Sequence, residues 1–363
     1  MMTAGEVMLF SGPGSPLQRH RALIPELKTG EVLIRNRFVT LCGSDLHTYT
    51  GKRTEACPTV LGHEVVGVVE QIGPGHSGTD LQGDILNRGD LVTWSVFASD
   101  PESYYARIGM PQKGTGLFKY GHAPVTATDV FHGGLAEYCI LKPGTAILKI
   151  PPAVPLPVAA TINCALATVA GALRLAGAVA GKQVMIFGDG LLGLSCAAMC
   201  RTAGAAWVGV AGARPRRIKQ AVDFGADVAF VTAPASVVWE GIREQFERKG
   251  VDVVFDMSGA PEAMEQGLQL LAVGGTAIWT GAVFKNRPVQ VNAEQLVRRL
   301  ITIKGLHNYN TGDLVAALDF IAGNWSHYPF ARVVEQEFCL SEANEAFAYA
   351  LREKPLRVGI RLP

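Results

Sequence analysis

The chain carries almost no net charge, and this argues against several classes of partner. Its 363 residues include 33 Lys and Arg against 32 Asp and Glu, for a net charge of +1 with histidine neutral. Proteins that bind nucleic acid or an acidic surface through charge need a clear basic excess. We therefore expect neither nucleic acid nor a membrane among the partners of this chain.

Cysteine is scarce, scattered and odd in number, which argues against a disulfide framework. Seven cysteines in a chain of this length favour a reducing, cytoplasmic setting. The start, MMTAGEVMLF, lacks a basic segment followed by a long apolar run, so it is not interpreted as a signal peptide. The longest apolar stretch, residues 153–181, contains Pro155, Pro157 and Arg174, and we interpret it as a buried helix rather than a membrane span.

The chain is long enough for two domains, and its pattern changes at Pro151-Pro152. Before these prolines, alternating strands such as residues 30–40 and 65–73 predict a β-rich domain. After them, strands alternate with helices, the rhythm of a doubly wound parallel sheet. Helices are expected at residues 191–203, 216–224, 236–248, 260–272, 312–322 and 341–352.

These patterns predict an α/β fold in three segments. Residues 1–152 form the first part of a β-rich domain, and residues 153–298 form a nucleotide-binding domain. Residues 299–363 return to complete the β-rich domain.

One short segment, residues 41–64, concentrates ligands of the kind that hold zinc. It contains Cys42 and, after a glycine, the pair His63-Glu64. Thiolate and imidazole are preferred zinc ligands, and a catalytic zinc needs three protein ligands with one position left open. The sequence therefore predicts a catalytic zinc centre whose third ligand comes from a distant segment.

The same segment carries groups that could move a proton. Ser44 and His47 follow Cys42 closely, where a hydroxyl and an imidazole could pass a proton outward. Asp45 is placed to accept a hydrogen bond from a ligating histidine and so to fix its tautomer. We expect Ser44, Asp45 and His47 to take part in catalysis.

A glycine-rich turn marks the nucleotide-binding domain. Gly188, Gly190 and Gly193 form a G-x-G-x-x-G pattern with Leu191 and Leu192, directly after the strand QVMIF and at the start of a helix. In this context the glycines permit a tight turn and a close approach of the pyrophosphate to the helix N-terminus.

The end of the second strand of that domain lacks the acid that binds the ribose of NAD. Gly212 stands at its place, followed by Arg214, Arg216 and Arg217. Because arginine binds a 2′-phosphate bidentately, this turn favours NADP(H) over NAD(H). The alternative is a solvated basic turn that starts a helix, although arginine in a first turn opposes the helix dipole.

Together, the C-x-S-D-x-H and G-H-E motifs resemble the catalytic-zinc signature of the zinc-dependent medium-chain alcohol dehydrogenase family. The resemblance implies a GroES-like catalytic domain around a central Rossmann domain. It implies Cys164 as the third zinc ligand and Glu64 as an alternating fourth. The turn at Gly212 and Arg214 also resembles the G-S-R-P turn of NADP-using bacterial members.

One departure from the family concerns a second, structural zinc. Many relatives hold it with four cysteines, at positions that correspond here to Asp100, Ser103, Ala106 and Gly114. The resemblance therefore implies a single, catalytic zinc and a lobe held by packing. The candidates for this packing are Tyr104, Tyr105, Phe118 and Tyr120.

The expected function is reversible hydride transfer between an alcohol and an aldehyde or ketone, with zinc and NADP(H), in a cytoplasmic homo-oligomer, a dimer or tetramer. One alternative is an NAD-dependent polyol or threonine-type dehydrogenase. Another is a non-catalytic nucleotide-binding sensor or structural protein.

Several segments also resemble a branch of the family associated with phosphonate catabolism. An anionic substrate would suit Lys52 and Arg53, which can also be interpreted as solvent-facing charges on a short helix.

Overall fold

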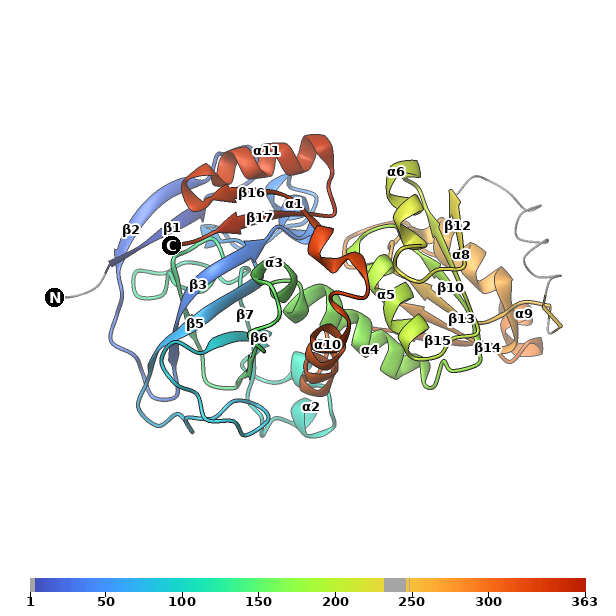
Figure 1. Cartoon of the computed structure of the whole chain (residues 1–363), viewed down its shortest axis with the longest axis horizontal. Helices are drawn as coiled ribbons and strands as arrows, with labels where there is room; N and C mark the ends of the chain where they lie inside the picture. The colour runs from blue at the N-terminus through green and yellow to red at the C-terminus, as the bar shows by residue number, and fades with distance from the viewer. Residues whose placement is uncertain (1–3, 232–245, 248) are drawn as a thin grey trace. The chain divides into compact units, whose positions relative to one another are not determined.

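The computed structural model describes residues 4–231, 246–247 and 249–363, and the chain divides into two compact units (Figure 1). One unit comprises Met1–Cys164, Asn310–Ser326 and Phe330–Pro363, so it is assembled from both ends of the chain. The other comprises Ala165–Tyr309 and His327–Pro329. We call them the first and the second unit.

The first unit is built on two β-sheets. An eight-stranded sheet has the order β16-β17-β3-β5-β6-β7, with β8 paired to β3 and β9 to β6, and a three-stranded sheet has the order β2-β1-β4. The strands are β1 Ala4–Phe10, β2 Gln18–Leu23, β3 Val32–Thr40, β4 Thr59–Val60, β5 Glu64–Ile72, β6 Leu91–Ala98, β7 Phe118–Lys119, β8 Tyr138–Leu141, β9 Thr145–Lys149, β16 Val334–Cys339 and β17 Arg357–Arg361.

The pairing of β3 with β5 places the ends of both strands together. The two strands are antiparallel, and Thr40 at the end of β3 lies opposite Glu64 at the start of β5. Both strands are largely buried, and β5 is rich in valine, as expected for the centre of a sheet. The residues that follow Thr40 and precede Glu64 are therefore neighbours in space.

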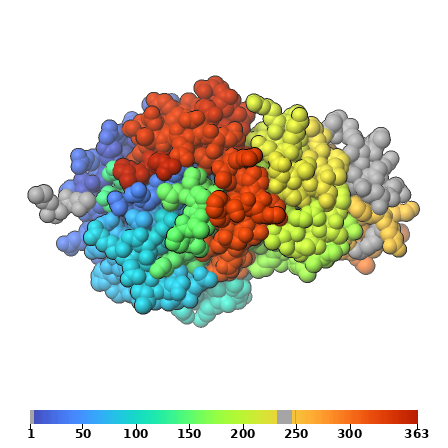
Figure 2. Space-filling model, viewed as in Figure 1, coloured from blue at the N-terminus to red at the C-terminus, as the bar shows by residue number. Residues whose placement is uncertain are grey.

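The C-terminal segment completes the first unit. Strand β17 pairs antiparallel with β3, and helix α11 (Ala343–Glu353) lies over β16 and β17 (Figure 1). Tyr49 packs against Phe347 of α11 with ring centroids 4.6 Å apart. In Figure 2 the C-terminal residues (red) lie beside the N-terminal residues (blue). The other helices of this unit are α1 Gly43–Tyr49, α2 Tyr104–Arg107, α3 Leu156–Ala159 and α10 Thr311–Asn324.

The second unit contains a six-stranded parallel sheet in the order β12-β11-β10-β13-β14-β15. This is the doubly wound order in which the first strand of the unit lies at the centre. The strands are β10 Gln183–Phe187, β11 Trp207–Gly212, β12 Val228–Val231, β13 Val251–Asp256, β14 Leu271–Trp279 and β15 Thr302–Gly305. The helices include α4 Ala167–Ala176, α5 Leu191–Thr202, α6 Pro215–Ile218, α8 Pro261–Leu270 and α9 Ala293–Arg298. The predicted α/β fold class is confirmed.

Some predicted helices differ from those in the structure. The helix expected at 216–224 is only the single turn α6 followed by a 3-10 turn, Lys219–Ala221. The helix expected at 260–272 ends at Leu270, because Leu271 already begins strand β14. Most of the helix expected at 236–248 lies outside the described residues.

The apolar stretch after the paired prolines is helical in several segments. Between α3 and α4 lies a π-helical turn, Ile162–Leu166. Among the described residues, the run Leu156–Ala176 is long and apolar enough to cross a membrane, but 67% of its most apolar window is buried within the structure. This degree of burial is typical of a core helix of a folded protein.

The lobe after β6 is held differently from the prediction. Tyr104 and Tyr105 are 66% and 48% exposed, so their predicted packing role is wrong. Tyr120 is buried; its hydroxyl lies 2.6 Å from Thr145 Oγ1 and accepts a hydrogen bond from the Lys142 amide at 2.7 Å. Phe118 packs edge-on against Tyr120.

Two of the four positions discussed for a structural zinc, Ser103 and Gly114, make close local contacts. Ser103 Oγ donates a hydrogen bond to the Asp100 carbonyl at 2.7 Å. A Cβ on Gly114 would lie 2.8 Å from Ser103 Oγ and 2.9 Å from Ser99 Cβ, so the chain passes too closely for a side chain at this position. These positions are thus occupied by a serine hydroxyl and a closely packed glycine.

These contacts predict that replacing two tyrosines of the lobe with alanine lowers the free energy of unfolding by different amounts. Tyr120→Ala should lower the free energy of unfolding by about 3–5 kcal/mol, because it opens a buried cavity and leaves the Lys142 amide without its acceptor. Tyr104→Ala should change it by less than about 0.5 kcal/mol, because its ring is exposed. Urea midpoints of the two variants measure the difference, and equal shifts would contradict this description of the lobe.

Candidate functional site

Three ligand side chains from distant parts of the sequence converge in the first unit. Cys42 follows the end of β3, His63 directly precedes β5, and Cys164 lies in the π-helical turn. Their ligand atoms all lie within 4.8 Å of one another; Cys42 and His63 are buried and Cys164 is partly exposed. Two sulfurs and one imidazole nitrogen at this spacing fit a zinc ion that keeps a fourth position open.

The backbone around Cys164 is tied to the segment that carries His63. Asn163, fully buried, donates a hydrogen bond from Nδ2 to the His63 carbonyl at 3.0 Å. A π-helical turn is rare and often marks a functional position, because the extra residue displaces one side chain from the regular helix. Here that turn carries Cys164.

A buried carboxylate holds both ends of the candidate metal centre. Asp45 is fully buried and lies 3.1 Å from His63 Nδ1 through its Oδ1. It also accepts hydrogen bonds from the backbone amides of Cys42 at 2.9 Å and Gly62 at 3.2 Å. The carboxylate keeps a proton on Nδ1, so that Nε2 carries the lone pair that a metal would take.

The acid–base character of the three ligands follows from their mutual contacts. A hydrogen bond from the Cys164 thiol, together with the charge of Arg357, outweighs burial and holds the pKa of Cys42 well below its usual value. The same hydrogen bond raises the pKa of Cys164. Burial opposes a charge on His63, but Asp45 and Cys42 raise its pKa overall. The cluster thus favours a thiolate at Cys42, which is the form that binds a metal.

Ser44 and His47 lie on α1 beside this cluster. Ser44 Oγ lies 3.3 Å from His63 Nε2. His47 is one helical turn further on and is half-buried; burial and then the charge of Lys52 lower its pKa. A neutral His47 is able to accept a proton near neutral pH.

A buried ion pair beside the metal ligands was not predicted. Arg357 of β17 binds Glu64 through two hydrogen bonds of 2.6 Å, and Thr40 donates a third to the same carboxylate at 2.6 Å. Burial raises the pKa of Glu64 to about 7 in spite of Arg357. Arg357 Nη2 also lies 3.8 Å from Cys42 Sγ. The sequence contains no clear signal of this pair, because the same strand ends in a second arginine, Arg361, which is exposed.

A second imidazole lies against His63. The His122 ring is 5.0 Å from that of His63, and its Nδ1 lies 3.4 Å from a Glu55 oxygen. Burial and then the charges of His63 and Arg53 hold the pKa of His122 well below its usual value. Arg53 pairs with Glu55 at 2.6 Å.

Lys52 and Arg53 do not lie on a helix, because α1 ends at Tyr49. That part of the sequence interpretation is wrong. Lys52 is exposed, in the turn after α1.

The glycine-rich turn of the second unit has the geometry its pattern predicts. Gly188 has φ +137°, and a Cβ on Gly193 would lie 1.9 Å from the Gly188 carbonyl oxygen. Gly190 is the N-cap of α5, and a Cβ built on it would meet no protein atom within 4 Å. Leu191 is buried and Leu192 is partly buried. The turn follows β10 where the strand order reverses, the usual position of a nucleotide site in such sheets.

An acid from another segment lies beside the end of β11, and the sequence pattern did not reveal it. Asp189 of the glycine-rich turn lies over Gly212: a Cβ on Gly212 would be 2.3 Å from Asp189 Cβ. The Asp189 carboxylate accepts hydrogen bonds from the Arg214 amide at 2.6 Å and from Arg214 Nη1 at 3.3 Å. Arg216 is exposed and Arg217 is partly exposed. The strand itself ends without an acid, as predicted, but the sequence pattern did not indicate that Asp189 lies beside Gly212.

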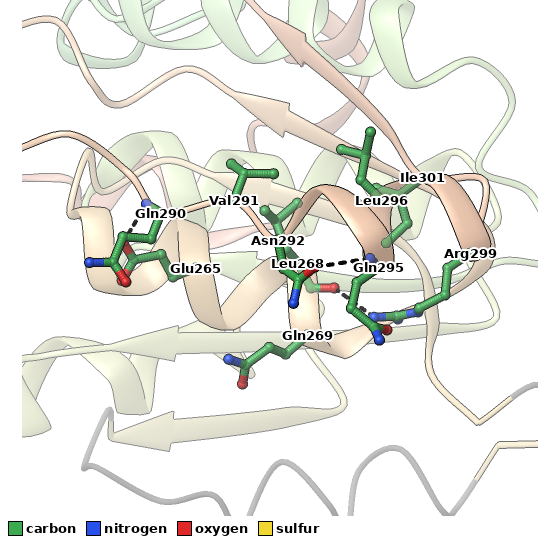
Figure 3. A pocket seen from close by; sticks show the side chains of 10 residues that line it. All are labelled: Glu265, Leu268, Gln269, Gln290, Val291, Asn292, Gln295, Leu296, Arg299 and Ile301. Carbon is green, nitrogen blue, oxygen red and sulfur yellow. Dashed lines mark hydrogen bonds between the residues drawn. The ribbon is translucent and has the colours of Figure 1, made fainter.

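A pocket of about 660 Å³ opens elsewhere in the second unit, beside α8 and α9 (Figure 3). Its charged groups already have partners: Arg299 donates to the carbonyls of Leu268 and Leu271, and Glu265 binds Arg287 and the Gln290 amide. The ten residues that line it include no thiol or imidazole. This pocket offers no catalytic chemistry of its own.

Comparison with known proteins assigns the family. The profile of the alcohol dehydrogenase GroES-like domain matches residues 28–152, and that of the zinc-binding dehydrogenases matches residues 192–323. An L-threonine 3-dehydrogenase of Pyrococcus horikoshii is 31% identical over 298 residues, 81% of this chain and 80% of that one. The chain belongs to the zinc-dependent medium-chain alcohol dehydrogenase family.

Solved structures agree with this assignment. An alcohol dehydrogenase of Thermotoga maritima is 27% identical with a TM-score of 0.93, over 99% of this chain and 100% of that one. A zinc-binding dehydrogenase of Sinorhizobium meliloti, solved with NADP, has a TM-score of 0.85 at 23% identity over 99% of both chains, which shows the fold. This family member is therefore an oxidoreductase; its placement in a phosphonate-associated branch stays a prediction.

The buried ion pair predicts a large and specific loss of stability. Arg357→Met should lower the free energy of unfolding by about 3–5 kcal/mol, because Glu64 then stays buried without its partner. Arg361→Met is the matched control on the same strand. Its partner Glu337 is exposed, at 2.7 Å, so the loss should be below about 1 kcal/mol.

A third variant separates the charge effect from lost packing. Adding Glu64→Gln to Arg357→Met should recover part of the stability, since no buried charge remains unpaired. Urea denaturation of the three variants tests this. A loss for Arg361→Met as large as for Arg357→Met would contradict the assignment.

Proposed function

We propose that this family member is a zinc-dependent dehydrogenase that transfers a hydride between an alcohol and NADP(H), and in reverse to an aldehyde or ketone. The observation that supports it most is the convergence of Cys42, His63 and Cys164. Zinc held there would act as a Lewis acid on the substrate oxygen. The remaining roles belong to side chains of this chain.

The ligand shell consists of three residues and one exchangeable carboxylate. Cys42, His63 and Cys164 hold the metal, and Asp45 orients the His63 ring through Nδ1. Glu64 is the proposed alternating fourth ligand. Both of its oxygens bind Arg357, so it would exchange that partner in order to reach a metal.

Ser44 and His47 are the proposed proton path. Ser44 Oγ accepts the proton of the alcohol, and its position 3.3 Å from His63 Nε2 supports this role. His47 takes the proton onward to water, and its lowered pKa keeps the ring ready to receive it.

The proposed cofactor is a nicotinamide dinucleotide, with NADP(H) favoured. Gly188 and Gly193 permit the tight turn, and the space beside Gly190 at the start of α5 leaves room for the pyrophosphate. Arg214, with Arg216 and Arg217 beside it, provides positive charge for a 2′-phosphate.

A second candidate function is an NAD-dependent threonine-type or polyol dehydrogenase. The 31% identity with an L-threonine 3-dehydrogenase favours it, and Asp189 adds an acid beside Gly212. Comparison of kcat/KM for simple alcohols, polyols and L-threonine, each with NAD and NADP, separates the two.

We also propose a cytoplasmic homo-oligomer, a dimer or tetramer. Exposed Val297 and Leu300 next to the edge strand β15 support self-association of the second unit. All seven cysteines are free, which supports a reducing compartment.

Metal analysis should find one zinc in each chain. Cys42→Ala should abolish both zinc binding and turnover but leave NADPH binding intact, because the glycine-rich turn lies in the other unit. Cys57→Ala is the matched control, since this thiol is exposed and outside the cluster. Two tightly bound zinc ions per chain, or full turnover in Cys42→Ala, would refute the proposal.

The proton path predicts an order of effects. Ser44→Ala should lower kcat by about a hundredfold with little change in KM, because the hydroxyl accepts the proton in the transition state and contributes little to substrate binding. His47→Gln should lower kcat by about tenfold or less, because water can replace the outer member of the path. Steady-state kinetics of both variants decide it, and a reversed order would place His47 before Ser44.

A further inference from the structure

The end of β11 lacks the acid that usually binds the cofactor ribose. A carboxylate from another segment occupies the space beside Gly212, the last residue of that strand. Asp189 reaches that space from the glycine-rich turn, and Gly212 makes room for it. A Cβ on Gly212 would lie 2.3 Å from Asp189 Cβ and 2.8 Å from its Oδ2. Any side chain at position 212 would therefore displace Asp189, so the glycine and the aspartate depend on each other.

Asp189 is also tied to the arginine expected to bind a 2′-phosphate. Its Oδ2 accepts the Arg214 amide at 2.6 Å, and its Oδ1 lies 3.3 Å from Arg214 Nη1. The Asp189 side chain is only 7% exposed, whereas that of Arg214 is 50% exposed. The carboxylate is thus fixed in place, and most of the guanidinium fork remains open to solvent.

The two side chains suit two different ribose groups. An ionised carboxylate has about four acceptor positions, and Arg214 uses two of them, so Asp189 retains capacity for a ribose hydroxyl. Arg214 retains N–H donors for a 2′-phosphate, since only Nη1 faces Asp189. The negative charge of Asp189 beside a bound phosphate would weaken that phosphate contact.

We propose that Asp189 and Arg214 form a two-part cofactor selector that admits both NAD(H) and NADP(H). Asp189 accepts the ribose hydroxyl of NAD(H), and Arg214 binds the 2′-phosphate of NADP(H). The carboxylate limits the preference for NADP(H) that Arg214 alone would give. This inference rests on the proposed function and assigns the selecting role to a residue of the glycine-rich turn.

The test uses the full chain and two probes that carry only the adenosine end of the cofactor. Adenosine 2′,5′-bisphosphate represents NADP(H), and adenosine 5′-monophosphate represents NAD(H). Isothermal titration calorimetry gives the ratio of their affinities, independently of the metal centre. The variants are Asp189→Asn, which keeps an acceptor for the Arg214 amide but removes the charge, and Arg214→Gln.

Asp227→Asn provides a matched control. Asp227 binds Arg201 and accepts the Val208 amide at 2.8 Å, so it repeats the pairing of Asp189 at the opposite end of the same strand. Its neutralisation should leave the ratio unchanged. Urea midpoints of all variants identify any loss of folding.

The unmodified chain should bind the bisphosphate more tightly than the monophosphate, by no more than about tenfold. Asp189→Asn should raise that ratio by about tenfold, because the like charge is gone and the acceptor for the ribose hydroxyl is weaker. Arg214→Gln should reverse the preference. An unmoved or lowered ratio in folded Asp189→Asn would overturn the selector, since a purely structural Asp189 predicts no change.

Failure of the selector differs from failure of the proposed function. If the unmodified chain binds NADPH or NADH but Asp189→Asn leaves the ratio unchanged, only the selector is wrong. A ratio clearly above about tenfold in the unmodified chain would also overturn it, because the carboxylate would then fail to limit the preference for the 2′-phosphate. If the unmodified chain binds neither probe and neither dinucleotide, both proposals are wrong.

Discussion

The candidate metal centre depends on one buried carboxylate. Asp45 has no exposed surface and receives three N–H groups: the amides of Cys42 and Gly62 and the Nδ1 of His63. A carboxylate in this position would be costly without such donors, and with them it fixes both the helix start and the ring orientation. Because these bonds join the segment of Cys42 to the segment of His63, two metal ligands are held in position before any metal binds.

The final strand completes that arrangement from the other end of the chain. Arg357 reaches Glu64 and approaches Cys42, so the segment after the second unit must return and pair with β3. A buried ion pair of this kind contributes little net stability, because desolvation offsets much of the attraction. The pair instead specifies one arrangement of the strands. Arg357 reaches Glu64 only when β17 pairs with β3 in the observed register.

The sequence predicted the local features well and the tertiary ones poorly. Two features could be predicted because they depend on residue type and spacing within short segments. They are the glycine pattern at 188, 190 and 193 and the metal ligands Cys42 and His63. Asp189 was overlooked because its neighbour Gly212 is distant in sequence and close only in the folded sheet. Arg357 was overlooked for the same reason. Tyr104 was misjudged because an aromatic side chain in a loop can be exposed without a sequence signal.

The most direct test of the central claim is zinc K-edge X-ray absorption of the purified chain. Cys42, His63 and Cys164 as ligands predict two sulfur neighbours at about 2.3 Å and at least one nitrogen or oxygen neighbour at about 2.0–2.2 Å. Replacement of Cys164 with Ser should reduce the sulfur count to one. A shell of four sulfurs, or one of nitrogen and oxygen only, would contradict the account.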